Sequence, residues 1–222
     1  METPTRVRAV VFDLDGTLID SYGAIAECFN HARTRLGEPP LSTDEVRRMV
    51  GHGLESLMEQ AVGTGRVDEA VRLFRERYDR ICTVSTVPLP EVPETLAALH
   101  DLGIRMGVAT NKPARFARRI LEALELMPPL AVAVGPGPGM PAKPDPSMVR
   151  QVLAELETGT SQALYVGDMG VDVATARAAG LPVWVLATGS SSRDELEAAG
   201  ADAILDRFSD LARLLAGPGG GW

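Results

Sequence analysis

The segment from Val7 to Asp20 restricts the possible folds of this chain most strongly. It starts with a valine-rich apolar run up to Phe12, which predicts a strand buried on both faces. Asp13 and Asp15 follow at its carboxyl end, where open α/β sheets bind their ligands. If the chain stays extended, the two carboxylates converge, and a hard cation such as Mg²⁺ is their natural partner. A solvated turn is the alternative, because Asp and Gly are common turn residues.

The rest of the chain shows two further patterns. Residues 20–84 have apolar positions at helical spacing and no clear strand, which predicts a compact helical insertion. Beyond it, short apolar runs alternate with amphipathic helical segments, as in parallel sheets covered by helices. We therefore expect an α/β fold, in which residues 1–19 and 85–216 form a Rossmann-like parallel-sheet core and residues 20–84 form an α-helical cap. Residues 217–222 are predicted to be a flexible tail.

Composition excludes several classes of protein. The net charge of −8 and the lack of a basic run argue against a nucleic-acid partner. No apolar stretch is long enough to span a membrane, and the polar start of the chain lacks a signal region, so we expect a cytoplasmic protein without a membrane partner. Cys28 and Cys82 are far apart and lack metal-ligand spacing, which indicates core thiols. A monomer and a homodimer both remain open.

Polar residues also follow two later predicted strands. Thr110 and Asn111 supply a hydroxyl and backbone N–H groups that can hold an anionic oxygen, although Thr110 taken alone fits a helix cap without a ligand better. Lys143 lies between Pro141 and Pro144, which hold the backbone extended. It could place an ammonium beside a phosphate or a carboxylate, or be an ordinary solvated lysine. The Gly- and Pro-rich residues 135–141 before it leave the course of that loop unpredicted.

Two more carboxylates follow another predicted strand. Asp168 comes directly at the strand end and is the stronger metal candidate, whereas Asp172 could serve the helix dipole alone. In a parallel sheet all these strand ends face one crevice. Carboxylates, a lysine and a hydroxyl in one crevice suit a divalent cation together with a phosphoryl group.

With these motifs in place, the sequence resembles the haloacid dehalogenase superfamily, and within it the phosphoglycolate phosphatase-like hydrolases with a helical cap. The resemblance covers nearly the whole chain, and the segment 20–84 is similar to the family's cap. It implies a phosphatase that hydrolyses a small phosphate monoester through an aspartyl-phosphate. The motifs that carry it are Asp13-Leu14-Asp15-Gly16-Thr17, Thr110 with Asn111, Lys143 with Pro144, and Gly167-Asp168 through Asp172.

The resemblance also implies roles for single residues. Asp13 is expected to be the nucleophile and a metal ligand, and Asp15 the general acid and base, with its backbone carbonyl on the Mg²⁺ ion. Asp168 is expected to bind Mg²⁺ and Asp172 to support that site. The residues expected to bind the phosphoryl group are Gly16, Thr110, Asn111 and Lys143.

Substrate choice and reaction type stay open at this point. His52, between two glycines of the cap, is a candidate for setting specificity, although an exposed histidine in a helix–helix turn fits slightly better. A phosphomutase or a pyrophosphatase would use the same carboxylates. A dehalogenase is disfavoured, because it needs neither Asp15 nor Mg²⁺. A phospho-accepting receiver module would lack the helical insertion, and a nucleotide-binding module would need a glycine-rich loop after the first strand.

Overall fold

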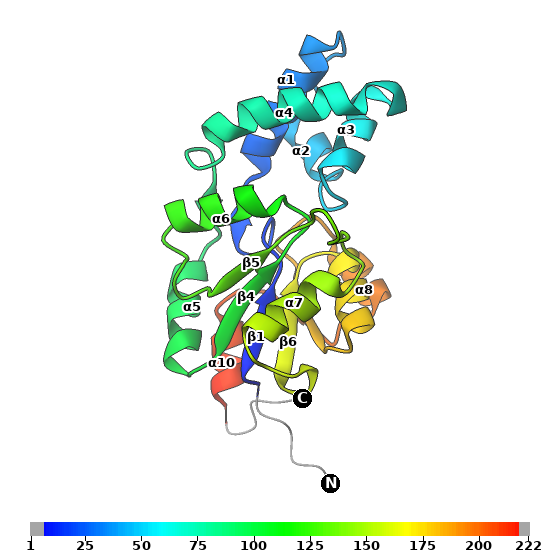
Figure 1. Ribbon diagram of the computed structural model, residues 1–222. Coiled ribbons are helices and arrows are strands. Elements are labelled where there is room, and N and C mark those ends of the chain that lie inside the picture. The colour runs from blue at the N-terminus through cyan, green and yellow to red at the C-terminus, as the bar shows by residue number, and fades with distance from the viewer. Residues whose placement is uncertain (1–6, 218–222) are drawn as a thin grey trace.

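The computed structural model describes residues 7–217 and contains a six-stranded sheet in which all neighbouring strands are parallel (Figure 1). The strand order β5-β4-β1-β6-β7-β8 puts β1 in the middle, and the chain extends the sheet first on one side of β1 and then on the other. The predicted α/β fold is therefore confirmed. The strands are β1 (Ala9–Phe12), β4 (Arg105–Ala109), β5 (Val132–Val134), β6 (Ala163–Gly167), β7 (Val183–Leu186) and β8 (Ala203–Leu205).

Helices cover both faces of this sheet (Figure 1). Side chains of β1 alternate between the faces, so Val10 and Phe12 belong to one hydrophobic cluster while Ala9 and Val11 belong to the other. All four are fully buried, as predicted for a central strand. The first cluster includes α5 (Val92–Asp101), α6 (Ala114–Ala123) and α10 (Asp210–Ala216), and the second includes α7 (Ser147–Glu155), α8 (Gly170–Ala179) and α9 (Arg193–Ala199).

A second group of helices follows β1 and lies beyond the carboxyl ends of the strands (Figure 1). Apolar side chains at helical spacing, such as Phe29 of α1 and Phe74 of α4, are buried between these helices. Ser42 begins α2 with a capping box, in which its side chain and that of Glu45 each accept from the other's backbone N–H. The helices are α1 (Tyr22–Arg35), α2 (Thr43–Arg47), α3 (Leu54–Val62), the 3₁₀ turn Thr64–Arg66 and α4 (Val67–Ile81). We call residues 20–84 the cap.

A short antiparallel ribbon joins the sheet domain to the cap. It pairs β2 (Ile19–Asp20) with β3 (Val87–Pro88). The segment that leads from the sheet domain into the cap therefore lies beside the segment that leads back. The sequence pattern did not predict this ribbon, because two-residue strands carry no periodicity. Cys28 and Cys82 are both buried and free, as predicted. None of the described helices has the length and apolar character needed to cross a membrane. Beyond Gly217, the predicted tail lies outside the described residues.

Candidate active site

Asp13 continues the central strand into the crevice at its carboxyl end. Its backbone N–H donates to Val166 of β6 at 2.9 Å, which extends the parallel pairing by one residue. The chain then turns sharply at Gly16, whose φ of +91° favours glycine. A Cβ at Gly16 would overlap the Tyr22 hydroxyl and the Asp168 carboxylate. This turn brings the Asp13-to-Thr17 segment against the end of β6.

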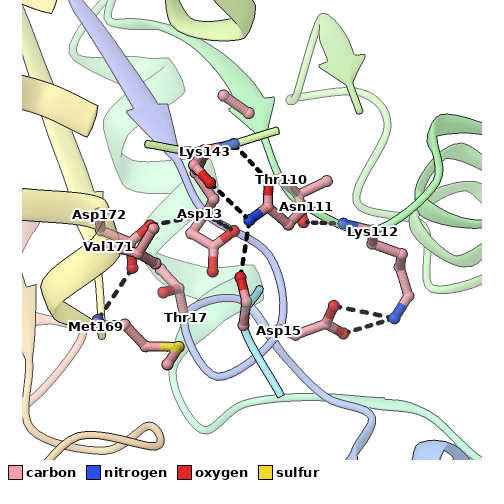
Figure 2. A network of polar contacts seen from close by, with 12 residues as sticks. Asp13, Asp15, Thr17, Thr110, Asn111, Lys112, Lys143, Met169, Val171 and Asp172 are labelled. Carbon is pink, nitrogen blue, oxygen red and sulfur yellow. Dashed lines mark hydrogen bonds and ion pairs between the residues drawn. The ribbon is translucent and has the colours of Figure 1, made fainter. Parts of the chain in front are cut away.

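Lys143 joins two carboxylates at the bottom of the crevice (Figure 2). Its Nζ lies 2.6 Å from Asp13 Oδ1 and 2.7 Å from Asp172 Oδ1, and its side chain is 2% exposed. Burial alone would lower the pKa of this ammonium, but Asp13 and Asp172 raise it well above its usual value. Its backbone N–H donates to Asn111 Oδ1 at 2.7 Å, so the end of β4 positions the loop that carries Lys143. The lysine is therefore charged, immobile and directed at Asp13.

The loop before Lys143 forms a tight turn. Gly137 and Met140 exchange two backbone hydrogen bonds, at 3.0 and 2.9 Å. Gly135 lies so close to Lys112 and Ala114 that a Cβ there would overlap their backbone atoms. The small residues of this loop thus let it pack against the segment after β4, which explains a composition that the sequence alone left uninterpreted.

Asp168 and Asp172 have different environments. Asp172 Oδ2 accepts the backbone N–H groups of Asp168 and Met169, at 3.1 and 3.0 Å, and so caps the start of α8. Asp168 is fully buried and accepts hydrogen bonds from the Thr17 hydroxyl at 2.8 Å and the Ser190 N–H at 3.0 Å. Burial, followed by the nearby Asp172 and Asp13, raises the pKa of Asp168 well above its usual value.

Asp13, Asp168 and Asp172 form an acidic group that fits a cation. Among the described residues, each offers a carboxylate oxygen, and these oxygens lie within 4.8 Å of one another. Burial raises the pKa of Asp13 to about 7 even though Lys143 lowers it. Because all three donors are carboxylate oxygens in an electronegative site, they suit a hard divalent cation. The hydrogen bonds on Asp172 leave Asp13 and Asp168 as the freer donors.

The Asp15 carboxylate faces a different lysine from Asp13 (Figure 2). Its two oxygens lie 2.8 and 3.0 Å from Lys112 Nζ, and the Ser21 hydroxyl also donates to it. Asp15 is thus not part of the acidic group around Asp13, and the extended geometry that would make the two carboxylates converge is not present. Its predicted metal contact through the backbone carbonyl stays a prediction.

A cavity of about 60 Å³ lies between this crevice and the cap. The sheet domain contributes Asp13, Asp15, Thr110, Asn111 and Lys143 to its lining. The Asn111 side chain also donates to the carbonyl of Gly51 at 2.8 Å and so connects the end of β4 to the cap. The cap, α6 and the start of α8 line the rest with mostly apolar side chains, among them Ile25, Val50, Leu54, Leu57, Phe74, Tyr78, Phe116 and Met169.

The structure places each residue expected to bind phosphate or to set specificity. Thr110 is 1% exposed, and its hydroxyl accepts the Lys112 N–H at 3.1 Å. Gly16 lies against Asp168 in the turn after Asp13. The side chain of His52 is exposed and does not line the cavity, whereas Gly51 and Gly53 on either side of it do. A specificity role for His52 stays a prediction.

Sequence reasoning assigned no role to three residues: Lys112 and Tyr78, which line the cavity, and Arg47, which connects the cap to the loop after β7. The composition contains a signal for Lys112: of the 22 basic residues only Lys112 and Lys143 are lysines, and the others are arginines. Both lysines line the cavity. Arg47 donates from the cap to the carbonyls of Thr188 and Gly189, at 2.9 and 2.7 Å, and its position in sequence gives no hint of this contact. Tyr78 looks like any apolar position of a helix.

Comparison with known proteins gives a consistent set of relatives. The model of the family described as haloacid dehalogenase-like hydrolase matches residues 10–186. A phosphoglycolate phosphatase of Rhodospirillum rubrum is 39% identical over 95% of this chain and 92% of its own length. One of Salmonella typhimurium is 32% identical over 98% and 96%. A crystal structure of a predicted phosphoglycolate phosphatase from Haemophilus somnus superimposes with a TM-score of 0.88 and 27% identity, covering 95% of this chain and 98% of that one.

Proposed function

Since this chain belongs to the haloacid dehalogenase-like hydrolases and is a phosphoric monoester hydrolase, we propose that it is a Mg²⁺-dependent phosphatase acting through an aspartyl-phosphate, with 2-phosphoglycolate as the favoured substrate. The observation that carries the proposal is the buried Lys143 ammonium 2.6 Å from the Asp13 carboxylate, within the acidic group. The names of the relatives that span nearly the whole chain support the choice of substrate. The small cavity fits a compact leaving group.

Asp13 is the proposed nucleophile. One of its carboxylate oxygens forms a bond to phosphorus while the bond from phosphorus to the ester oxygen breaks, which divides the hydrolysis into two easier steps. Lys143 offsets the repulsion between this carboxylate and the anionic phosphoryl group. Thr110 and Asn111, which line the same cavity at the end of β4, are the proposed donors to the phosphoryl oxygens.

Asp15 is the proposed proton carrier. In its protonated form it donates to the leaving alkoxide, and as a carboxylate it then takes a proton from the water that attacks the aspartyl-phosphate. Its hydrogen bonds with Lys112 and Ser21 hold it apart from Asp13 in this conformation. Like-charge repulsion from a bound phosphate ester favours the protonated form that the first step needs.

Asp13 and Asp168 are the residues that would hold Mg²⁺, together with the backbone carbonyl of Asp15, and Asp172 would orient Lys143 and the start of α8. A bound Mg²⁺ ion supplies charge neutralisation for the transferring phosphoryl group. The Thr17 hydroxyl and the Ser190 N–H orient Asp168 through its hydrogen bonds. The cap closes the cavity and excludes water during the first step.

A panel of phosphate esters tests this proposal. Purified protein is assayed for phosphate release from 2-phosphoglycolate, pyrophosphate, hexose phosphates and nucleotides, each with Mg²⁺ and with EDTA. The proposal expects Mg²⁺-dependent release that is fastest with 2-phosphoglycolate. Conversion of a hexose 1-phosphate to its 6-phosphate in the presence of a bisphosphate would instead show a mutase. Release that is unaffected by EDTA would contradict the metal requirement.

Two further expectations accompany this function. Small phosphate esters are formed by metabolism inside the cell, so we expect the protein in the cytoplasm. Cell fractionation can check this expectation. We expect a monomer or a homodimer, and light scattering coupled to size-exclusion chromatography distinguishes the two. A larger assembly would contradict the second expectation.

A further inference from the structure

The Tyr78 hydroxyl is a buried polar group that lies beside the Lys112 ammonium, which can only donate to it, and its own proton has no acceptor among the described residues. Among the described residues, three buried side-chain atoms have no hydrogen-bond partner: Arg75 Nε, the Tyr78 hydroxyl and Thr86 Oγ1. Of these residues, only Tyr78 lines the cavity above Asp13. Buried polar groups are normally bonded, and an unpaired one costs free energy. A hydroxyl left unpaired beside a cavity is therefore expected to bond to what fills that cavity.

Packing fixes the position of Tyr78. Its ring stacks on Phe74 with ring centres 5.2 Å apart and meets the edge of Phe116 at 5.0 Å. Both neighbours also line the cavity. Burial raises the pKa of Tyr78 to about 12, so the hydroxyl keeps its proton and serves as a donor near neutral pH. A rigid donor of this kind is suited to recognising an acceptor on a bound molecule.

Lys112 lies beside this hydroxyl and is the second cation of the cavity. Its Nζ is 5.0 Å from the centre of the Tyr78 ring and pairs with both oxygens of Asp15. Among the described residues that line the cavity, the basic ones are Lys112 and Lys143, and Lys143 is committed to Asp13 and Asp172. An anionic group on the leaving side of a substrate therefore has Lys112 and Tyr78 as its available partners.

We propose that the Tyr78 hydroxyl and the Lys112 ammonium together bind a carboxylate on the leaving group of the substrate, and that this carboxylate replaces Asp15 as the partner of Lys112. The proposal rests on the phosphatase function given above. The favoured substrate, 2-phosphoglycolate, is a phosphate ester of a small hydroxy acid, and the proposal assigns the residues that recognise this class. The exchange releases the Asp15 carboxylate from Lys112.

The size and polarity of the cavity agree with this class. Its volume of about 60 Å³ is small beside typical ligand pockets of roughly 300–1,000 Å³. The apolar side chains of the cap offer few other donors to a leaving group. A compact leaving group with one anionic end offers an acceptor to both Lys112 and Tyr78, whereas a neutral leaving group would leave Lys112 paired with Asp15.

The kinetic test compares two substrates that differ in that anionic end. The rate constant kcat/KM is measured for 2-phosphoglycolate and for 2-hydroxyethyl phosphate, in which an alcohol replaces the carboxylate. We expect the wild type to prefer 2-phosphoglycolate, and Tyr78→Phe to reduce that preference about 10- to 100-fold, the effect of one hydrogen bond to a charged group. Lys112→Met should reduce it further. Thr86→Val, which removes a buried unpaired hydroxyl outside the cavity, is the matched control and should leave the preference unchanged.

A binding test avoids turnover altogether. Because the chain has two lysines, protein labelled with ¹³C at lysine Cε gives two side-chain signals, which Lys112→Arg assigns. Titration with glycolate, the leaving group of 2-phosphoglycolate, should shift the Lys112 signal, while ethylene glycol should not. In the Tyr78→Phe protein the glycolate affinity should fall by a similar factor of about 10 to 100.

The outcomes separate this inference from the proposed function. Equal losses for the two esters in Tyr78→Phe, or no response of Lys112 to glycolate, would overturn the recognition site while phosphatase activity stands. A protein that hydrolyses no ester of the panel but binds glycolate at Lys112 would keep the carboxylate site and overturn the phosphatase. Preference for hexose phosphates over both small esters would overturn the substrate class.

Discussion

Two lysine–aspartate pairs lie in the same cavity but differ in their surroundings. Lys143 pairs with Asp13 and also with Asp172, and all three residues come from the sheet domain. Lys112 pairs with Asp15, whose side chain is 12% exposed, and lies against Tyr78 of the cap. Lys143 is thus held by two carboxylates within one domain, whereas Lys112 pairs with a single carboxylate and contacts the cap.

This difference indicates a division of labour. A nucleophile has to be fixed relative to the phosphoryl group, because small displacements from the reacting geometry reduce the rate strongly. A proton carrier has to change its charge twice in each cycle, and a partner that can be exchanged makes that change easier. The rigid pair therefore suits Asp13 and the exchangeable pair suits Asp15. The four predictions below separate the two pairs by experiment.

The largest effect is expected from Asp13→Asn. Replacing the nucleophilic oxygen with an amide should reduce kcat by at least about 10⁴-fold, because the aspartyl-phosphate cannot form. The measurement is phosphate release from 2-phosphoglycolate, with incorporation of ³²P into the protein as a second readout. Asp101→Asn, which neutralises an exposed carboxylate of α5, is the matched control and should behave as wild type. Activity within tenfold of wild type in Asp13→Asn would contradict the nucleophile assignment.

A smaller loss with a different signature is expected from Asp15→Asn. Loss of a general acid and base reduces the rate by about 10²- to 10⁴-fold. Since the nucleophile is intact, the second step should slow as well, and ³²P should accumulate on the protein when a substrate with a good leaving group, such as p-nitrophenyl phosphate, is used. A rapid quench followed by protein precipitation measures this labelling. Labelling of Asp13→Asn but not of Asp15→Asn would reverse the two roles.

The sequence predicted the outline of this site well because strand ends are local features. Asp13 directly follows a buried apolar strand, so it lies at the crevice independently of the conformation of the loops. The same holds for Asp168 after β6. Helical periodicity likewise predicted the cap helices. These inferences need only the period of the pattern and the parallel topology.

What the sequence could not predict are contacts between distant segments. The direction of the Asp15 carboxylate depends on a lysine 97 positions later, and the approach of Gly189 to Asp168 depends on the loop after β7. Tyr78 has the same spacing as the core residues of α4, so its unpaired hydroxyl becomes evident only when the cavity is known. Periodicity assigns a side chain to a face but does not identify its neighbours from another element.

The stabilities of two lysine variants sharpen the comparison between the pairs. Lys143→Met leaves Asp13 and Asp172 buried without their cation, and breaking such a buried pair costs about 3–5 kcal/mol. Lys112→Met leaves only Asp15, which keeps the Ser21 hydrogen bond and some exposure, so we expect a loss of about 1–3 kcal/mol. Urea unfolding in metal-free buffer measures both free energies of unfolding. Equal losses would show that the second carboxylate adds nothing to the first pair.

The smallest effect is expected from Arg47→Met, which probes the dependence of the second pair on the cap. Arg47 donates from the cap to the Thr188 and Gly189 carbonyls, so its loss removes hydrogen bonds that hold the cap against the sheet domain. A net cost of about 0.5–1.5 kcal/mol should raise KM about two- to tenfold, while kcat changes little. In protein labelled at lysine Cε, the signal of Lys112 should move and that of Lys143 should not, because only Lys112 contacts a cap residue. Arg48→Met, which changes an exposed neighbour on the same helix end, is the matched control. Movement of both signals would mean that the first pair also depends on cap closure, and the distinction between a fixed and an exchangeable pair would then fail.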